Sequence, residues 1–293
     1  MKLALFGDIH HFFDDKDVQY FNNSDFDFLI FTGDLPDFFH LRKKIYKVLR
    51  KLKKKSYLIW GNHDGFSFLE VVGEIFKKNF LRVKEKDFNK IETRLKRLQN
   101  ELGENFVCGG FQIEKLNDSL ALFLVRPHSI GGDSIAYKEY LKKKYIIYDL
   151  ESSFLKMKKL LHEYLEKNTL RTLIFLGHNG PHGLGNLPYD LWGCDFNPQL
   201  GDFGDKDYTK IIQYAQSLNI QIPLVIGGHM HHKLSKQIKE QRERKSIAKL
   251  NNTYYINPAK VPRISKNLRY FVSVEFLSDT SVKVQEMNLG NEL

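Results

Sequence analysis

The sequence predicts an α/β fold built around a parallel sheet. Three short apolar runs, Leu3–Phe6, Phe28–Phe31 and Tyr57–Trp60, are typical of buried strands. Two segments with helical periodicity, Asp14–Phe21 and Leu41–Leu52, separate these runs. An alternation of strands and helices implies right-handed crossovers, which place the three strands parallel in one sheet.

The rest of the chain continues the mixture of helices and strands. Residues 66–102 are strongly charged and show two helical patterns, which we interpret as an insertion or cap. Residues 181–207 show no periodicity, and a loop of this length is usually functional. Further helices are predicted at 152–167 and 208–218. Further strands are predicted within 106–125 and at 173–176, 223–226, 253–256, 269–276 and 282–287.

Length and composition indicate one globular domain. The chain has 293 residues, of which 42% are hydrophobic and 27% charged, and this balance argues against disorder. We see no linker, internal repeat or low-complexity tract, so we expect a single domain over residues 1–293 with the 66–102 insertion inside it.

Several classes of protein are excluded or disfavoured. The two cysteines, Cys108 and Cys194, do not make a disulfide scaffold and fit a reducing compartment. The first apolar run is too short for a signal peptide, and no stretch of about 18 apolar residues predicts a membrane span. We therefore expect a cytoplasmic protein without a membrane partner. The net charge of +10 is weak evidence for phosphate-rich or acidic partners.

Five predicted strand ends carry residues of the metal-ligand type. They are Gly7-Asp8-Ile9-His10, Gly33-Asp34, Gly61-Asn62-His63-Asp64, Gly177-His178 and Gly228-His229-Met230-His231. Carboxylate oxygen and imidazole nitrogen suit Mn, Fe and Zn, and open α/β sheets place their sites at the carboxyl ends of strands. A single Asp or His at a strand end is commonly a cap, but five in succession predict a metal centre.

These motifs resemble those of the calcineurin-like metallophosphoesterase superfamily. The patterns GDxH, GD, GNH[DE], GH and GHxH occur here in that order, and the resemblance extends from Met1 to about Arg263. The resemblance implies a four-layer αββα sandwich of two mixed sheets, here with a helical insertion. It also implies a binuclear metal-dependent phosphoesterase using Mn, Fe or Zn, with Mn favoured.

Carried over residue by residue, the resemblance assigns seven ligands to two metal ions. The first ion takes Asp8, His10 and His231, the second takes Asn62, His178 and His229, and Asp34 bridges both.

Two neighbouring residues receive catalytic roles from the same resemblance. His63 would be the catalytic histidine, and a protonated His63 would donate to the departing alkoxide. Asp64 is a candidate to orient it. Two cations about 3.5–4 Å apart lower the pKa of a shared water and neutralise phosphate charge, so this set suits in-line attack on phosphorus.

Other residues are weaker candidates. Arg126, His128 and His182 are candidates for a substrate pocket, and structural roles are the alternative. The block Tyr189–Phe196, with Gly201–Asp205 and Ile256–Arg263, is similar to an uncharacterised branch found in cyanobacteria and plastids. This block should border the site, either contacting substrate or packing Trp192 and Phe196 over the sheet edge.

The expected activity is hydrolysis of a small or medium phosphoester. We expect the insertion and residues 181–207 to flank the metal centre and narrow access to it. The oligomeric state is not predicted.

Two alternatives stay open. Arg42–Lys55 holds nine Lys and Arg residues and Lys233–Lys249 holds seven, which suits a nuclease. However, aromatic residues are not interleaved with these stretches, and we expect the first of them to lie away from the metals on the outer face of the sheet. The second alternative is a non-catalytic binding or scaffold protein, against which the presence of His63 argues.

Overall fold

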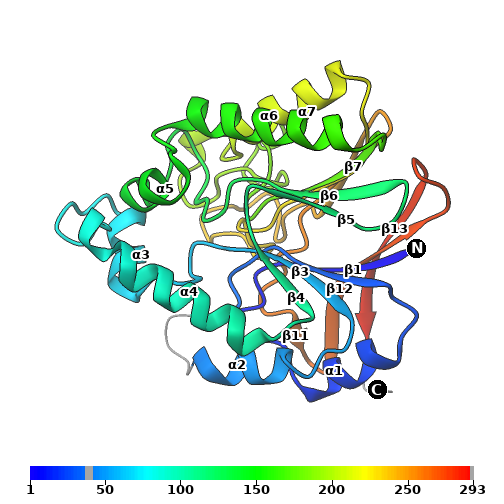
Figure 1. The fold of residues 1–293 in the computed structure, drawn as a ribbon. Coiled ribbons are helices and arrows are strands. Elements are labelled where there is room, and N and C mark those ends of the chain that lie inside the picture. The colour runs from blue at the N-terminus through cyan, green and yellow to red at the C-terminus, as the bar shows by residue number, and fades with distance from the viewer. Residues whose placement is uncertain (37–41, 291–293) are drawn as a thin grey trace.

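Two mixed β-sheets lie at the centre of the computed structural model, which describes residues 1–36 and 42–290 (Figure 1). The first sheet has the strand order β11-β12-β1-β2-β3-β4, with β13 paired to β12. Its strands are β1 (Lys2–Phe6), β2 (Phe28–Phe31), β3 (Lys55–Ile59), β4 (Phe106–Gly109), β11 (Ile264–Ser265), β12 (Leu268–Phe276) and β13 (Val282–Leu289).

The second sheet has the order β5-β6-β7-β8-β10-β9. Its strands are β5 (Gln112–Lys115), β6 (Leu120–Leu124), β7 (Thr172–Leu176), β8 (Gln221–Ile226), β9 (Ile247–Leu250) and β10 (Thr253–Ile256). Strands β1 to β4 run parallel, and so do β6, β7, β8 and β10. Each sheet therefore has a run of parallel strands that end at a common edge. Antiparallel strands flank this run on the β12 side of the first sheet and on both sides of the second.

Helices cover the outer side of each sheet, which completes the four-layer α/β arrangement expected from the motifs (Figure 1). The first layer contains α1 (Asp15–Asn23), α2 (Arg42–Leu49) and α4 (Phe88–Leu102), and the second contains α6 (Leu150–Lys167) and α7 (Lys206–Ser217). The remaining helices are α3 (Phe68–Ile75), α5 (Lys138–Tyr145) and the short 3-10 helices Glu85–Asp87 and Pro198–Leu200.

Local sequence signals explain where the helices begin. Asp14 caps α1 by accepting from the backbone N–H of Lys16 and Asp17, and Asp17 completes a capping box. Asp149 caps α6 in the same way with Ser152. These caps satisfy N–H groups that the first turn of a helix leaves without an internal partner.

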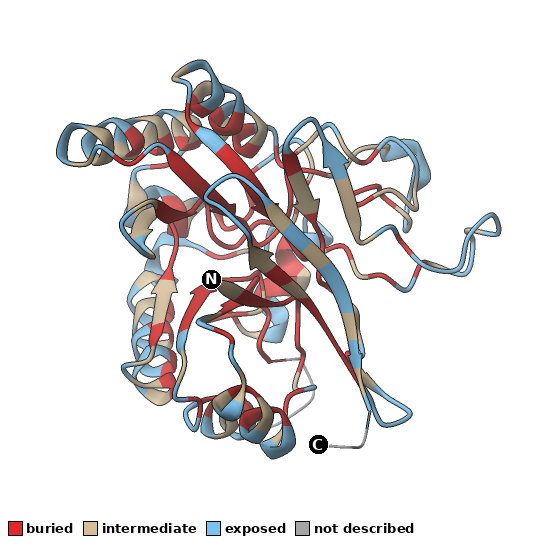
Figure 2. Cartoon of the chain, turned by 90° about the vertical axis from the view of Figure 1, so that its right-hand side faces the viewer, coloured by how far each residue is buried: buried red, intermediate tan, exposed pale blue. Residues whose placement is uncertain are grey.

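The core is formed where the apolar faces of both sheets and the inner faces of the helices meet. Figure 2 shows the buried residues concentrated in the strands, with exposed residues on the outer helical faces and loops. The Phe6 ring lies between the rings of Phe21 and Phe31, at centroid distances of 5.0 and 4.9 Å. Such aromatic contacts bury large apolar surfaces, so they fix β1 and α1 firmly against each other.

Most predicted elements are present, and the differences have physical causes. The sequence Lys138–Tyr145 forms α5 although half of its residues are lysine, because Tyr140 and Leu141 bury one short face. β9 lies in the charged segment 233–250 and forms by pairing with β10. Residue 41, the predicted start of α2, lies outside the described residues.

One of the two α-helices in the predicted insertion, α4, belongs to the outer helical layer. α4 packs against α2 and β4, so it lies beside the first sheet. The cap role of residues 66–102 stays a prediction for α3 and the turn that follows it. Among the described helices, none is both long and apolar enough to cross a membrane.

Candidate metal centre

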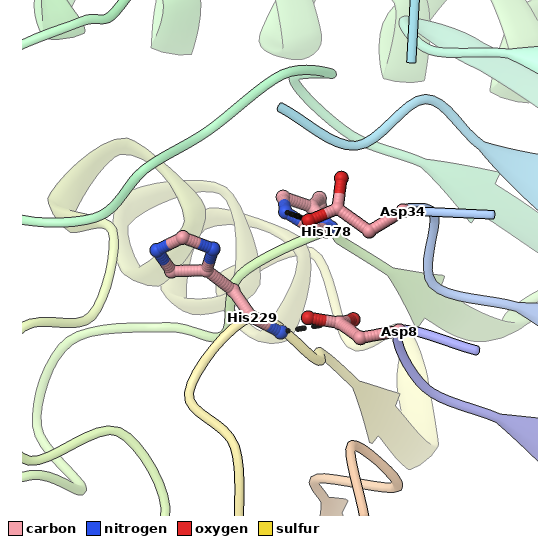
Figure 3. A group of neighbouring side chains, drawn as sticks. All are labelled: Asp8, Asp34, His178 and His229. Carbon is pink, nitrogen blue, oxygen red and sulfur yellow. Dashed lines mark hydrogen bonds and ion pairs between the residues drawn. The ribbon is translucent and has the colours of Figure 1, made fainter. Parts of the chain in front are cut away.

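Loops from both sheets bring the predicted ligands to one edge of the sandwich. Asp8 and Asp34 follow β1 and β2, while His178 and His229 follow β7 and β8 (Figure 3). Their candidate ligand atoms all lie within 4.8 Å of one another. Because the strands of each parallel run end at the same edge, side chains distant in sequence meet here.

A second group shares one carboxylate with the first. Candidate ligand atoms of Asp8, His10 and His231 also lie within 4.8 Å of one another. Asn62 joins the first group, since its Oδ1 lies 2.7 Å from His178 Nε2. All seven predicted ligands are therefore brought together, and Asp8, rather than Asp34, is the residue common to both groups.

Four of the predicted ligands have left-handed backbone conformations. Asp8, His10, Asp34 and His229 have φ angles of 39°, 37°, 50° and 65°. Each such conformation in a non-glycine residue costs on the order of 1–3 kcal/mol and persists where the surrounding structure enforces it. Strain at four predicted ligands points to a functional site rather than to a set of turns.

Two glycines permit the loops to approach the carboxylates. A Cβ at Gly61 would lie 2.2 Å from Asp34 Oδ1, and one at Gly228 would lie 2.5 Å from Asp8 Oδ1. Any larger residue would push the loop away from the carboxylate. Gly61, before Asn62, and Gly228, before His229, are therefore required because the backbone passes so close to these carboxylates.

Each of the two central carboxylates has one oxygen held by donors and one directed at imidazole nitrogens. Asp8 Oδ1 accepts from Thr32 Oγ1 at 3.0 Å and from the His229 N–H at 3.2 Å. Asp8 Oδ2 is buried, accepts no hydrogen bond from the described residues by geometric criteria, and lies 3.3 Å from His231 Nε2. Such an oxygen is suited to a cation placed between it and the ring.

Asp34 repeats this arrangement. Its Oδ1 accepts from the His63 N–H at 2.8 Å, and its Oδ2 lies 3.6 Å from His178 Nε2 and 3.7 Å from His63 Nε2. The distances from Oδ2 are too long for hydrogen bonds, so this oxygen faces the two rings without bonding either.

Backbone carbonyls select the tautomers of two histidines. His178 Nδ1 donates to the Thr32 carbonyl at 2.6 Å, and His10 Nδ1 donates to the Pro36 carbonyl at 3.1 Å. In the neutral rings Nε2 is then the nitrogen that carries a lone pair. Metal-binding histidines are oriented in this way by a carbonyl on the other nitrogen, so the donor set fits a bound cation.

Burial dominates the electrostatics of the ion-free site. Burial, with the nearby Asp8 and Asp64 carboxylates, raises the pKa of Asp34 well above its ordinary value. Burial, with the His178 ring, lowers the pKa of His229 to about 3. Burial and the His10 ring lower the pKa of His63 to about 2. Burial therefore favours the neutral rings of His229 and His63, and a neutral imidazole is the form that binds metals.

The comparisons agree with this geometry. The family model for calcineurin-like phosphoesterases matches residues 1–233. The chain belongs to the calcineurin-like phosphoesterase family. This family points to a metal-dependent hydrolase, and the Asp and His groups supply the metal-binding site that such chemistry needs.

Solved structures place this calcineurin-like phosphoesterase among proteins of the same fold. A dimetal phosphatase from Danio rerio is 10% identical with a TM-score of 0.54, and the match covers 98% of this chain and 96% of that one. An archaeal phosphodiesterase is 12% identical with a TM-score of 0.41, covering 99% and 100%. At 10% identity, the likeness to the Danio rerio phosphatase concerns the fold alone. No curated protein matches the chain significantly.

The two predicted catalytic residues differ in their surroundings. The His63 ring lies beside Asp34 and packs 5.0 Å from the His10 ring, so it borders both groups. The Asp64 carboxylate is fully buried and accepts the N–H groups of Gly61, Asp34 and Leu35 at 2.8, 3.0 and 3.3 Å. These bonds join the loops after β2 and β3, so Asp64 positions the Asp34 backbone.

Two predicted pocket residues of this phosphoesterase are buried. Arg126 is 2% exposed, and its guanidinium donates to Asp205 and Asp207 at 2.7–3.1 Å. His128 is fully buried, and its Nδ1 bonds the Gly61 carbonyl at 2.8 Å. Burial and internal hydrogen bonds favour the structural alternative for both residues over contact with substrate, because a buried charge needs internal partners.

His182 lies in a different hollow. It lines a cavity of about 250 Å³ with residues of α7 and of the β9–β10 hairpin. The described residues that line this cavity include none of the seven predicted ligands. This placement gives no support to a role for His182 in a substrate pocket at the metal centre, which stays a prediction.

One contact to the site had no signal in the sequence. The Tyr137 hydroxyl donates to the Asn62 carbonyl at 2.7 Å, and its ring stacks on Phe66 with centroids 3.7 Å apart. Tyr137 lies in an irregular segment, where periodicity gives no information. The contact of Thr32 with Asp8 likewise has no signal in the sequence, although Thr32 directly precedes the Gly33-Asp34 motif.

Proposed function

We propose that this calcineurin-like phosphoesterase hydrolyses a small or medium phosphoester at a centre of two metal ions. The observation that carries the proposal is the pair of Asp and His groups that share Asp8. Two overlapping donor groups of this kind suit two adjacent cations, which is the arrangement used for in-line displacement at phosphorus.

The proposed ligands follow the motifs. Asp8, His10 and His231 hold one ion. Asn62, His178 and His229 hold the other. Asp34 bridges them, as the resemblance implies, and Asp8 is the second candidate for the bridge because it belongs to both groups.

Bound ions, with Mn favoured over Fe and Zn, would neutralise phosphoryl charge and lower the pKa of a water. The chain supplies the remaining parts. His63 is the proposed hydrogen-bond donor to the leaving-group oxygen, since its ring borders both groups and its side chain is 13% exposed. The His231 side chain, 38% exposed, marks the side from which substrate arrives.

The surroundings of the centre favour a small substrate. The carbonyl of Phe203, in the 181–207 segment, accepts from Gly132 N–H at 3.0 Å and from Asn179 Nδ2 at 2.9 Å. Since Asn179 directly follows His178, this segment lies against the site. The basic helix α2 packs with α1 and α4 in the outer layer.

A substrate panel tests the proposal. p-Nitrophenyl phosphate, bis-p-nitrophenyl phosphate, nucleotides and single-stranded DNA would each be incubated with metal-free protein, with and without added Mn²⁺. Mn-dependent release of p-nitrophenol supports the proposal, and the ratio of the two chromogenic rates separates monoesterase from diesterase. Turnover of DNA alone favours the nuclease. Two bound ions without turnover of any substrate favour a binding protein.

A further inference from the structure

Arg244 connects the loop formed by residues 188–195 to a proposed metal ligand. It is 3% exposed and lies in the charged segment between β8 and β9. Its Nε donates to the His231 carbonyl at 3.0 Å. The other donors go to the 188–195 loop: Nη1 reaches the carbonyls of Pro188, Asp190 and Gly193 at 2.9, 2.7 and 2.7 Å, and Nη2 reaches Asp195 Oδ1 at 2.8 Å.

Further contacts join the same loop to the turn that contains His229 and His231. Asn257 Nδ2 donates to the Met230 carbonyl at 2.7 Å and to the Leu191 carbonyl at 2.9 Å. The Met230 side chain packs with Leu191 and Trp192 in a small apolar cluster separate from the main core. The loop therefore supports the turn from its buried side through both backbone and side chain.

Backbone bonds also hold this turn: the His229 N–H donates to Asp8 Oδ1 at 3.2 Å, and the His232 N–H donates to the Ala259 carbonyl at 3.0 Å. Arg244 is the side chain that binds the His231 carbonyl. His229 has a φ of 65°, so the turn begins with a strained residue. The His231 side chain is 38% exposed, and its ring packs on one side against the His10 ring, with centroids 5.2 Å apart. Arg244 holds the backbone carbonyl of His231 and so helps to set where the ring lies relative to Asp8.

We propose that Arg244 is a positioning residue for His231, and that through it the 188–195 loop sets the affinity of the ion held by Asp8, His10 and His231. The inference rests on the proposed function. Arginine suits the role because its planar fork serves five acceptors at once from a buried position, whereas lysine offers a single nitrogen. Loss of a group that orients a metal ligand typically weakens binding of the metal by about 10–100-fold.

Mn²⁺ titration of the metal-free protein tests the proposal. Calorimetry, with elemental analysis after gel filtration, would give the affinity and number of ions for the wild type and for Arg244→Lys. We expect one of the two ions to bind about 10–100-fold more weakly in Arg244→Lys, while the other keeps its affinity. Arg269→Lys is the matched control, since Arg269 is also buried and ion-paired but contacts Asp14 and Asp17.

A double-mutant cycle separates positioning from general destabilisation. If Arg244 acts through His231, Arg244→Lys should add nothing to the loss of Mn²⁺ affinity in His231→Ala. Additive losses, or equal weakening in Arg269→Lys, would show a general effect of stability and overturn the proposal. Asp195→Asn removes one partner of the fork and should weaken the same ion by a smaller factor. If Arg244→Lys does not fold, Asp195→Asn replaces it as the test variant. Unchanged Mn²⁺ affinity in Asp195→Asn then overturns the proposal.

Failure of this inference is distinguishable from failure of the proposed function. If the wild type binds two Mn²⁺ ions and Arg244→Lys binds them with unchanged affinity, only the role of Arg244 is lost. If the wild type binds no Mn²⁺, the two-ion centre itself is wrong.

Discussion

His178 Nε2 and Asn62 Oδ1 lie 2.7 Å apart. The Nδ1 of the same imidazole donates to the Thr32 carbonyl, so in the neutral ring Nε2 is an acceptor, as Asn62 Oδ1 is. Two acceptors in contact repel each other, and His178 is fully buried, so water cannot relieve the repulsion. A cation bound by both atoms does relieve it. Asp8 Oδ2 and Asp34 Oδ2 also face imidazole nitrogens, at 3.3 Å from His231 Nε2 and 3.6 Å from His178 Nε2.

Binding of Mn²⁺ should therefore stabilise the fold. A ligand that binds only the native state at 100 times its Kd adds about 2.7 kcal/mol to the free energy of unfolding. Thermal unfolding in excess Mn²⁺ and in chelator measures the shift, and His178→Ala should show much less of it. Identical unfolding temperatures in Mn²⁺ and chelator would contradict the metal centre.

His63→Ala should reduce turnover by about 10²–10⁴, the usual contribution of a positioned acid–base group. Its content of Mn²⁺ should equal that of the wild type, because His63 is not among the proposed ligands. Steady-state kinetics and elemental analysis on the same preparation check both statements. His162→Ala is the control, since His162 lies on the surface of α6 and bonds Tyr214, and it should keep full activity.

Asp34→Asn should lose metal rather than only turnover. A bridging ligand has to supply negative charge to two cations, and an amide cannot. Elemental analysis of Asp34→Asn and Asp8→Asn, set against His63→Ala, identifies the bridge, since its loss should release both ions. Metal loss in His63→Ala as large as in Asp34→Asn would remove the distinction between ligand and donor.

Tyr137→Phe removes only the hydroxyl that donates to the Asn62 carbonyl. A buried carbonyl left without a partner costs about 1–3 kcal/mol, so the free energy of unfolding should fall by that amount. Mn²⁺ affinity should also fall, because the Asn62 backbone is loosened. Denaturant unfolding and Mn²⁺ titration measure these changes. Tyr270→Phe, whose hydroxyl bonds Glu286, should affect stability alone.

The sequence motifs predicted which residues meet at the site, whereas hydrophobic periodicity did not predict which buried residues surround it. Asp8, Asp34 and His229 each directly follow glycine at a strand end, and this local pattern carries the geometry that brings them together. The carboxylate partner Asp205 of Arg126, and the partners of Arg244 in the 188–195 loop, lie dozens of residues away in sequence, so the burial of both arginines follows only from tertiary contacts.

A comparison of hydrolysis rates on a small ester and on nucleic acid tests which class of substrate the protein uses. Cleavage of a polymer requires many phosphate contacts, so it should depend steeply on salt, and the basic helix α2 would have to supply those contacts. α2 lies in the outer layer with α1 and α4, so Lys44→Glu with Lys47→Glu should leave the hydrolysis of p-nitrophenyl phosphate unchanged. Rates on the chromogenic ester and on single-stranded DNA would be measured over a range of salt concentrations with Mn²⁺ present. We expect ester hydrolysis with weak dependence on salt and little cleavage of DNA. Strong, salt-sensitive DNA cleavage that the double variant abolishes would replace the small-ester proposal with the nuclease.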